Sequence, residues 1–181
     1  MAIRTDDDLI NTFMPIINDI MENMTDRIEK LLVQHINTDV YGINKTSTDT
    51  PAINDYYLDG TGRPSYEFRD KAWQKRVSKT IAETCVGEIF YDGNQMTPPS
   101  ANSPYLHGNY NAGVDRRNKL ADLLNVSGIA GDSDFVYNKT RSPFWDNFLD
   151  ELSLKIGGWL YTEFNNKGIK IPALKFFKAG M

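Results

Sequence analysis

Apolar side chains recur every three or four positions from residue 9 to residue 36, with polar side chains between them. This spacing places the apolar groups on one side of an α-helix, so it predicts a long amphipathic N-terminal helix over about 9–36. Its apolar positions are Leu9, Phe13, Ile16, Ile17, Ile20, Met24, Ile28, Leu31 and Leu32. Pro15 either kinks this helix or marks its first turn, because proline lacks a backbone N–H. Such a helix is about 42 Å long, and its far end packs either on its own core or on a neighbouring subunit.

A second helical stripe lies near the C-terminus. Its apolar positions are Trp145, Phe148, Leu149, Leu152, Ile156, Trp159, Leu160 and Phe164. Ser142 fits the N-cap, Pro143 fits the first helical position, and Gly168 fits the residue after the helix end. Gly157 and Gly158 each weaken the helix by about 1 kcal/mol relative to Ala, which indicates close approach of the backbone to the sheet or to the first helix.

The segment between the two helices has weaker signals. Residues 37–65 are rich in Asn, Thr, Asp and Gly, which predicts a polar loop. Residues 65–73 suit a short helix, although the spacing of Tyr66, Phe68 and Trp73 does not decide it. We expect these three side chains to pack in the core rather than to form a binding site. Residues 80–91 favour a strand. Further expected elements are a turn at Asp92-Gly93, a short helix within 114–126, a brief strand at 134–137 and an edge strand at 169–172.

These elements predict the α+β class, with a long N-terminal helix and a C-terminal amphipathic helix packed on a small antiparallel sheet. A chain of 181 residues is long enough for one domain with a sizeable core. We expect a single domain over residues 1–181. Its parts are the N-terminal helix (about 9–36), the polar loop (37–65), an α+β core (66–171) and a C-terminal tail (172–181).

The net charge of −4 argues against a general nucleic-acid binder, which needs a face rich in Lys and Arg. One local basic patch stands out, and a solvated helix face explains it better than a phosphate-binding surface. Its members are Arg69, Lys71, Lys75, Arg76 and Lys79. The acidic N-terminus is unlike a signal peptide, and no apolar run approaches the length of about 20 residues that spans a bilayer. We therefore expect no nucleic-acid or membrane partner and a protein made in the cytoplasm.

Nucleophilic chemistry has few candidates in this chain. Cys85 is the only cysteine, which excludes an intrachain disulfide and a zinc site of several thiolates. His35 fits a helix end or core edge, and His107 fits a turn in a loop. The enzymatic alternative is a nucleophile pair of Cys85 and His107. It is disfavoured because Cys85 lacks basic neighbours that would clearly lower its pKa.

Acidic side chains offer little more. The run Asp6–Asp8 fits the start of a helix, where negative charge complements the helix dipole, better than a cation site. Asp132 and Asp134 resemble part of a calcium loop but lack the closing Glu. Phosphate-binding glycine motifs do not occur. The sequence therefore predicts no catalytic residue, no metal site and no cofactor.

The order of several motifs nevertheless resembles a known family. GRPSYEFRDKAW is followed by EIFYDGNQM, an HG pair, RRNKLADLL, RSPFWDNFLDEL and NNKGIKI. This order is similar to that of tailed-phage neck proteins, the minor capsid or tail-completion proteins related to the HK97 gene-10-like family. The matching positions are Pro64, Tyr66, Arg69, Trp73, Tyr91, Asp92, His107, Gly108, Arg141, Pro143, Phe144, Lys167, Gly168 and Ile169. The chain departs from the pattern in the polar insert at 41–56 and in the tail FFKAGM.

The resemblance implies a non-enzymatic ring subunit at the head–tail junction of a bacteriophage virion. Its partners would be copies of itself and other neck, portal-proximal or tail proteins, met in the host cytoplasm during assembly. A tail terminator or minor capsid protein is the alternative within the same particle. The aromatic side chains of loops and tail either contact such partners or cover the core. The candidate interface residues are Tyr41, Tyr56, Tyr57, Tyr105, His107, Tyr110, Phe176 and Phe177.

Overall fold

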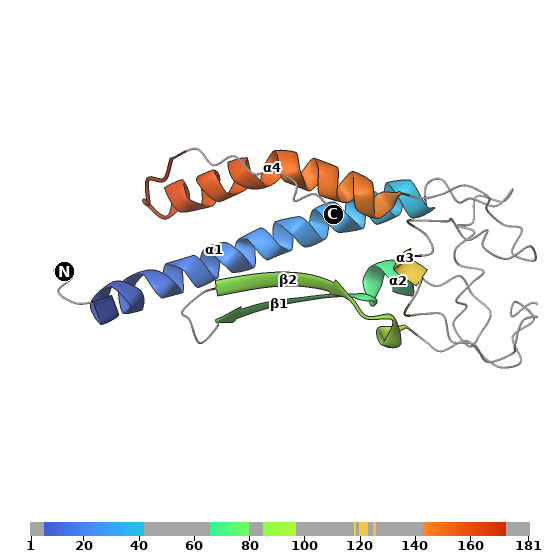
Figure 1. The fold of residues 1–181 in the computed structure, drawn as a ribbon, viewed down its shortest axis with the longest axis horizontal. Helices are drawn as coiled ribbons and strands as arrows, with labels where there is room; N and C mark the ends of the chain where they lie inside the picture. Colours follow the sequence, from blue (N-terminus) through green and yellow to red (C-terminus); the bar gives the residue numbers. More distant parts are fainter. Residues whose placement is uncertain are drawn as a thin grey trace, which may run out of the picture. The chain divides into compact units, whose positions relative to one another are not determined.

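The computed structural model describes residues 6–41, 66–79, 85–96, 118, 120–122, 125 and 143–172. Its elements in chain order are α1 (Asp6–His35), the π-helix η1 (Ile36–Tyr41), α2 (Glu67–Asp70), β1 (Trp73–Lys79), β2 (Cys85–Tyr91), the 3-10 helix η3 (Gly93–Gln95), α3 (Leu120–Asp122) and α4 (Phe144–Asn166) (Figure 1). β1 and β2 form a two-stranded antiparallel sheet. The predicted α+β class, with a long helix near each end of the chain, is confirmed.

The chain divides into two compact units. The first unit comprises Met1–Leu31, Lys75–Ile89 and Leu149–Met181, and the second comprises Leu32–Gln74 and Phe90–Phe148. The division falls inside α1, β1, β2 and α4. The single domain expected over residues 1–181 stays a prediction.

In the first unit, α4 runs antiparallel to α1 (Figure 1). The Glu163 carboxylate accepts hydrogen bonds from Arg27 at 2.6 Å and from Asn23 at 3.3 Å, and Lys167 pairs with Asp19 further along. The residue numbers fall along α1 as they rise along α4, which fixes the direction. Glu163 is 5% exposed, so its charge depends on these two donors from α1.

The other contact of α1 in the first unit is with the hairpin of β1 and β2. Lys75 reaches Asp26 at 2.8 Å and Glu29 at 2.6 Å. The hydrogen bond from Lys75 lowers the pKa of Asp26, and the hydrogen bond to Asp26 raises the pKa of Lys75. Across the hairpin, Arg76 pairs with Glu88. These pairs set the strands against each other and against α1.

Gly87 lies where β2 packs against Met21 and Thr25 of α1. A Cβ atom at Gly87 would be 2.4 Å from the Thr25 Oγ1 atom and 3.3 Å from the Met21 side chain. Thr25 is buried and donates a hydrogen bond to the Met21 carbonyl oxygen at 2.7 Å, so its side chain is held in place. A side chain at this position would therefore have to displace the Thr25 side chain from its hydrogen bond.

The two central glycines of α4 differ from each other. Gly157 is buried. Gly158 is exposed, and a Cβ atom built on it would meet nothing within 4 Å. The expectation that close approach to the sheet or to α1 explains both glycines is therefore wrong for Gly158.

In the second unit, the apolar stripe of α1 continues into η1. Ile36 and Val40 are fully buried, and the Thr38 hydroxyl donates to the Gln34 carbonyl oxygen at 2.8 Å. A wider π-type turn keeps both apolar side chains inward while Thr38 satisfies a carbonyl at the end of α1. The polar loop predicted over 37–65 is thus wrong for residues 37–41.

The short helix expected over 65–73 is longer than the helix that the structure contains there. The structure has α2 only at Glu67–Asp70, and Trp73 begins β1. The Asp92 N–H donates to the Ala72 carbonyl oxygen at 2.7 Å, which joins the segment before β1 to the segment after β2. The strand expected over 80–91 is confirmed for Cys85–Tyr91, and residues 80–84 and 134–137 lie outside the described residues. α3 falls within the short helix expected over 114–126.

The helix ends agree in part with the sequence signals. Gly168 has φ +74°, its N–H donates to the Asn165 carbonyl oxygen, and the Ile169 N–H donates to that of Phe164. These bonds form a Schellman motif, so the predicted C-terminal glycine is confirmed. α4 begins at Phe144, one residue after the expected Pro143, and Ser142 lies outside the described residues.

Two further expectations are wrong. Pro15 lies inside α1, which begins at Asp6, so it does not mark the first turn. The segment 169–172 forms no strand in the structure, because the Schellman motif turns the chain away from the helix end without pairing it to the sheet.

We predict that the same substitution has opposite effects at two glycines. Gly87→Ala should lower the free energy of unfolding by about 1–3 kcal/mol, because the new methyl group collides with Thr25. Gly158→Ala should raise it by about 1 kcal/mol, because alanine favours a helix and the site is open. Urea denaturation of both variants measures the difference. Equal effects at the two positions would contradict the packing of β2 on α1.

Candidate functional site

Aromatic rings from four segments meet in the second unit. Phe68 of α2 lies 6.1 Å from Trp73, 5.8 Å from Tyr91 and 5.8 Å from Phe144, measured between ring centroids. Trp73 stacks on Trp145 with centroids 5.4 Å apart and an interplanar angle of 14°. Phe68 and Phe144 are almost fully buried. We call these five residues the ring cluster, and it holds α2, both strands and the start of α4 together.

One polar atom in the ring cluster has no hydrogen-bond partner. The indole Nε1 atom of Trp73 is buried and unpaired. A buried N–H without a partner costs free energy, so the packing of the Trp73 ring has to outweigh that cost. Tyr66, expected to pack with Phe68 and Trp73, is instead 40% exposed, with the Arg69 guanidinium 4.7 Å above its ring.

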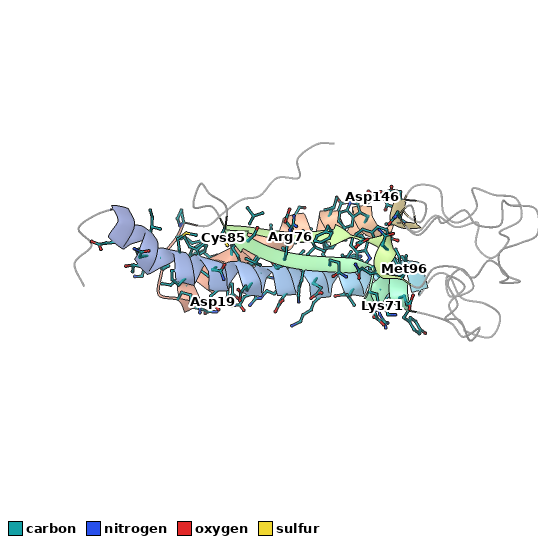
Figure 2. The ribbon with its side chains drawn as sticks, turned by 90° about the horizontal axis from the view of Figure 1, so that it is seen from below. Asp19, Lys71, Arg76, Cys85, Met96 and Asp146 are labelled. Atoms are coloured by element: carbon teal, nitrogen blue, oxygen red, sulfur yellow. The ribbon has the colours of Figure 1, made fainter. Side chains whose placement is uncertain are left out.

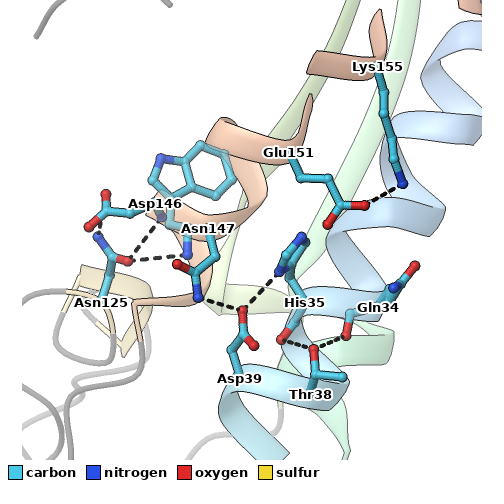
Figure 3. Close-up of polar contacts among 10 residues, drawn as sticks. Gln34, His35, Thr38, Asp39, Asn125, Asp146, Asn147, Glu151 and Lys155 are labelled. Carbon is cyan, nitrogen blue, oxygen red and sulfur yellow. Dashed lines mark hydrogen bonds and ion pairs between the residues drawn. The ribbon is translucent and has the colours of Figure 1, made fainter. Parts of the chain in front are cut away.

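A polar group lies where α1 passes into η1 (Figure 3). His35 is 9% exposed, and its Nδ1 atom lies 2.8 Å from an Asp39 carboxylate oxygen. The same oxygen accepts a hydrogen bond from the Asn147 side chain of α4 at 3.0 Å. The His35 ring also meets Phe148 edge-on at 6.4 Å. The expected core-edge position of His35 is confirmed, and its contacts tie η1 to the first turn of α4.

Asn125 caps the N-terminus of α4 (Figure 3). Its side-chain oxygen accepts from the Trp145 N–H at 3.2 Å and the Asp146 N–H at 3.4 Å, and its amide donates to Asp146 at 3.5 Å. The first N–H groups of a helix lack partners within the helix, and Asn125 supplies the acceptor for two of them. Nothing in the local sequence indicates a cap from so distant a position.

The expected basic patch is not one helix face. Arg69 lies in α2, Lys71 follows α2, and Lys75 and Arg76 lie in β1. Four of its side chains lie beside carboxylates. The pairs are Arg69–Asp70, Lys71–Glu67, Lys75–Asp26, Lys75–Glu29 and Arg76–Glu88. Charges neutralised in this way are poorly suited to holding a phosphate backbone.

Cys85 lies at the start of β2 (Figure 2), and its thiol is 3.7 Å from the Asn18 side-chain oxygen. Burial raises the pKa of the Cys85 thiol, and the negative charge of Glu22 raises it further. Both effects disfavour the thiolate, which is the nucleophilic form. His107, its suggested partner, lies outside the described residues.

Metal binding finds no support in the part of the chain that the structure describes. Asp6–Asp8 form the start of α1, in agreement with the helix-start interpretation. No group of three or more His, Cys, Asp or Glu side chains among the described residues could hold a metal ion. Asp132 and Asp134 lie outside the described residues.

The candidate interface residues fall almost entirely outside the described residues. Those outside are Tyr56, Tyr57, Tyr105, His107, Tyr110, Phe176 and Phe177. Tyr41 is the last residue of η1. Their role as an interface stays a prediction. The ring cluster and the polar contacts of His35, Asp39, Asn125 and Asn147 are therefore what the structure itself brings together.

Comparison of the chain with protein-family models, with curated proteins and with solved structures finds no match in any of the three. Among the described residues, neither α1 nor α4 nor any shorter helix is long and apolar enough to cross a membrane.

Truncating Trp73 tests the ring cluster. Trp73→Ala should lower the free energy of unfolding by roughly 3 kcal/mol, because it removes a ring that contacts Phe68, Tyr91, Phe144 and Trp145. Trp73→Phe should cost much less, because it keeps an aromatic ring and removes the buried N–H that has no partner. Thermal and urea denaturation compare the two, and equal losses would contradict this role of the ring.

Asn125→Ala should lower the free energy of unfolding by about 1 kcal/mol, because it leaves the Trp145 and Asp146 N–H groups without their cap. Asn165→Ala, at an exposed position near the other end of α4, is the matched control and should leave stability nearly unchanged. Loss of helical circular dichroism on heating reports both. A neutral Asn125→Ala variant would show that water caps α4 equally well.

Proposed function

We propose that this chain is a structural protein of a tailed-bacteriophage virion, acting at the head–tail junction as a neck, connector or tail-completion subunit. The observation that carries the proposal is the ring cluster. Trp73, Tyr91 and Phe144 come from three of the separate motifs whose order resembles the neck proteins, and their rings lie 5.2–6.1 Å apart where they meet at Trp73. Residues that match a family pattern and share one core are what a common fold requires.

Two other positions that match the neck-protein pattern stabilise a turn and a helix end. The Asp92 N–H bonds to Ala72, and the Asp92 side chain accepts from the Asn94 N–H at 3.0 Å, which forms the turn after β2. Gly168 closes α4 with a positive φ. Asp92 and Gly168 therefore stabilise the fold, and neither role involves chemistry on a substrate. They support an architectural function.

The chemistry of the described residues points the same way. Burial and the charge of Glu22 raise the pKa of the Cys85 thiol, and four cationic side chains of the basic patch lie beside carboxylates. A protein that works by assembling with others needs complementary surfaces rather than an activated nucleophile. Ring assembly would use repeated heterologous contacts, in which each copy offers two different surfaces to its neighbours.

The contacts with neighbours are proposed to come from the end of η1, the segments expected to be loops and the tail. The candidate interface tyrosines at 41, 56, 57, 105 and 110, together with Phe176 and Phe177, supply aromatic rings of the kind enriched at interfaces. The proposed partners are further copies of the chain and the proteins above and below it in the particle.

Two measurements test the proposal. Gold-labelled antibody against this chain, applied to particles from a strain that produces them, should mark the junction between head and tail in negative-stain micrographs. Purified protein should form closed rings in the same images. Label on the shell of the head alone, or particles that carry none, would contradict the proposed position.

A paired substitution separates assembly from folding. Tyr56→Ala should leave the thermal midpoint unchanged and reduce ring formation, whereas Trp73→Ala should lower the midpoint itself. Light scattering after size exclusion and thermal denaturation are measured on the same samples. If both variants lose stability equally, the polar loop belongs to the core and not to an interface.

A further inference from the structure

The outward face of α4 in the first unit carries large apolar side chains in contact with water. Leu154 is 85% exposed and Tyr161 is 43% exposed. Gly158 lies between them, four positions after one and three before the other, so all three share one face of the helix. Asn165 extends this face by one more turn and is also exposed. We call Leu154, Gly158, Tyr161 and Asn165 the α4 stripe.

The glycine in this stripe has no role in the packing of its own chain. Its missing side chain would meet nothing within 4 Å, and it is not among the described glycines with positive φ. The Thr162 hydroxyl donates to its carbonyl oxygen at 2.8 Å, a bond that alanine would also allow. Glycine in a helix interior is unfavourable, so the chain bears a cost with no internal benefit. It leaves a notch between two projecting side chains, where another helix backbone can approach closely.

We propose that the α4 stripe pairs with the α4 stripe of a second copy of this chain, antiparallel, with the two-fold axis passing beside Gly158. In this arrangement the two glycines face each other and let the backbones approach. Leu154 then lies against the flat ring of Tyr161 of the second copy, and the reverse contact repeats across the axis. Leu154 and the Tyr161 ring that it contacts both lie on the α4 stripe, as an isologous contact requires.

Charge favours a second copy and sets the direction of pairing. The stripe itself carries no charged side chain, and the ammonium group of Lys155, the residue after Leu154, is bound to Glu151. Asp150 is exposed one turn before Leu154. Antiparallel pairing brings its carboxylate near the Asn165 amide of the second copy, which can donate to it. Parallel pairing would instead bring the two Asp150 carboxylates together, which is unfavourable.

The inference stands apart from the proposed virion role. A two-fold contact joins copies in pairs, whereas a ring closes through contacts between different surfaces. The stripe covers only about three turns of helix, less than a standard stable interface. We therefore expect a weak dimer that forms as the protein concentration rises.

Sedimentation velocity over a concentration series tests the pairing with the full chain. Wild-type protein should shift towards a dimer, and Leu154→Glu should abolish the shift because it buries a charge in the contact. Gly158→Ala should weaken the dimer while raising the thermal midpoint, a combination that a purely internal role of Gly158 does not produce. Gln34→Glu adds the same charge at an exposed position of α1. It should change neither dimer formation nor the thermal midpoint. A wild-type protein that stays monomeric, or associates unchanged in Leu154→Glu, would overturn the proposal.

Disulfide cross-linking tests the geometry, in a chain where Cys85→Ser removes the natural thiol. Gly158→Cys should cross-link two copies under mild oxidation, because the positions face each other across the axis. Leu154→Cys should not, because the two thiols would be about 10 Å apart along the helix, too far for a disulfide. Cross-linking at Leu154→Cys as fast as at Gly158→Cys would exclude the antiparallel arrangement.

Discussion

Burial of aromatic rings is the constraint on which the second unit depends. α2 has four residues and the sheet has two strands, and elements this short are marginal in water by themselves. They persist because Phe68, Trp73, Tyr91 and Phe144 exclude water from one another. The unpaired Trp73 N–H shows how strongly packing dominates here, since the ring is buried although its polar atom gains no partner.

In the first unit a buried carboxylate fixes how two long helices align. Glu163 accepts from Arg27 and from Asn23, which lie one turn apart on α1. Sliding α4 by a turn would separate the carboxylate from one or both donors and leave a charge buried without compensation. Apolar stripes alone tolerate such a shift, because Leu and Ile side chains repeat at every turn. The register is therefore specified by polar groups and stabilised by apolar ones.

The sequence predicts elements whose signals are local, and it fails where distant segments decide. α1 and α4 follow from their stripes, and Gly168 follows from the chemistry of a helix end. β1 was not predicted, because Lys75 and Arg76 interrupt its apolar alternation and their neutralising carboxylates lie partly on α1. The Asn125 cap has no local signal at all. The candidate interface residues come from composition alone, so their placement could not be derived, whereas Phe68 and Trp73 were expected to pack and do.

The stacked pair of Trp73 and Trp145 gives the second unit an internal optical probe. Two indole rings held nearly parallel couple their electronic transitions, and the resulting near-ultraviolet circular dichroism depends on that geometry. One ring comes from β1 and the other from the first turn of α4, so the signal vanishes when either element leaves its place. The integrity of the second unit can therefore be read on its own, without attaching a label.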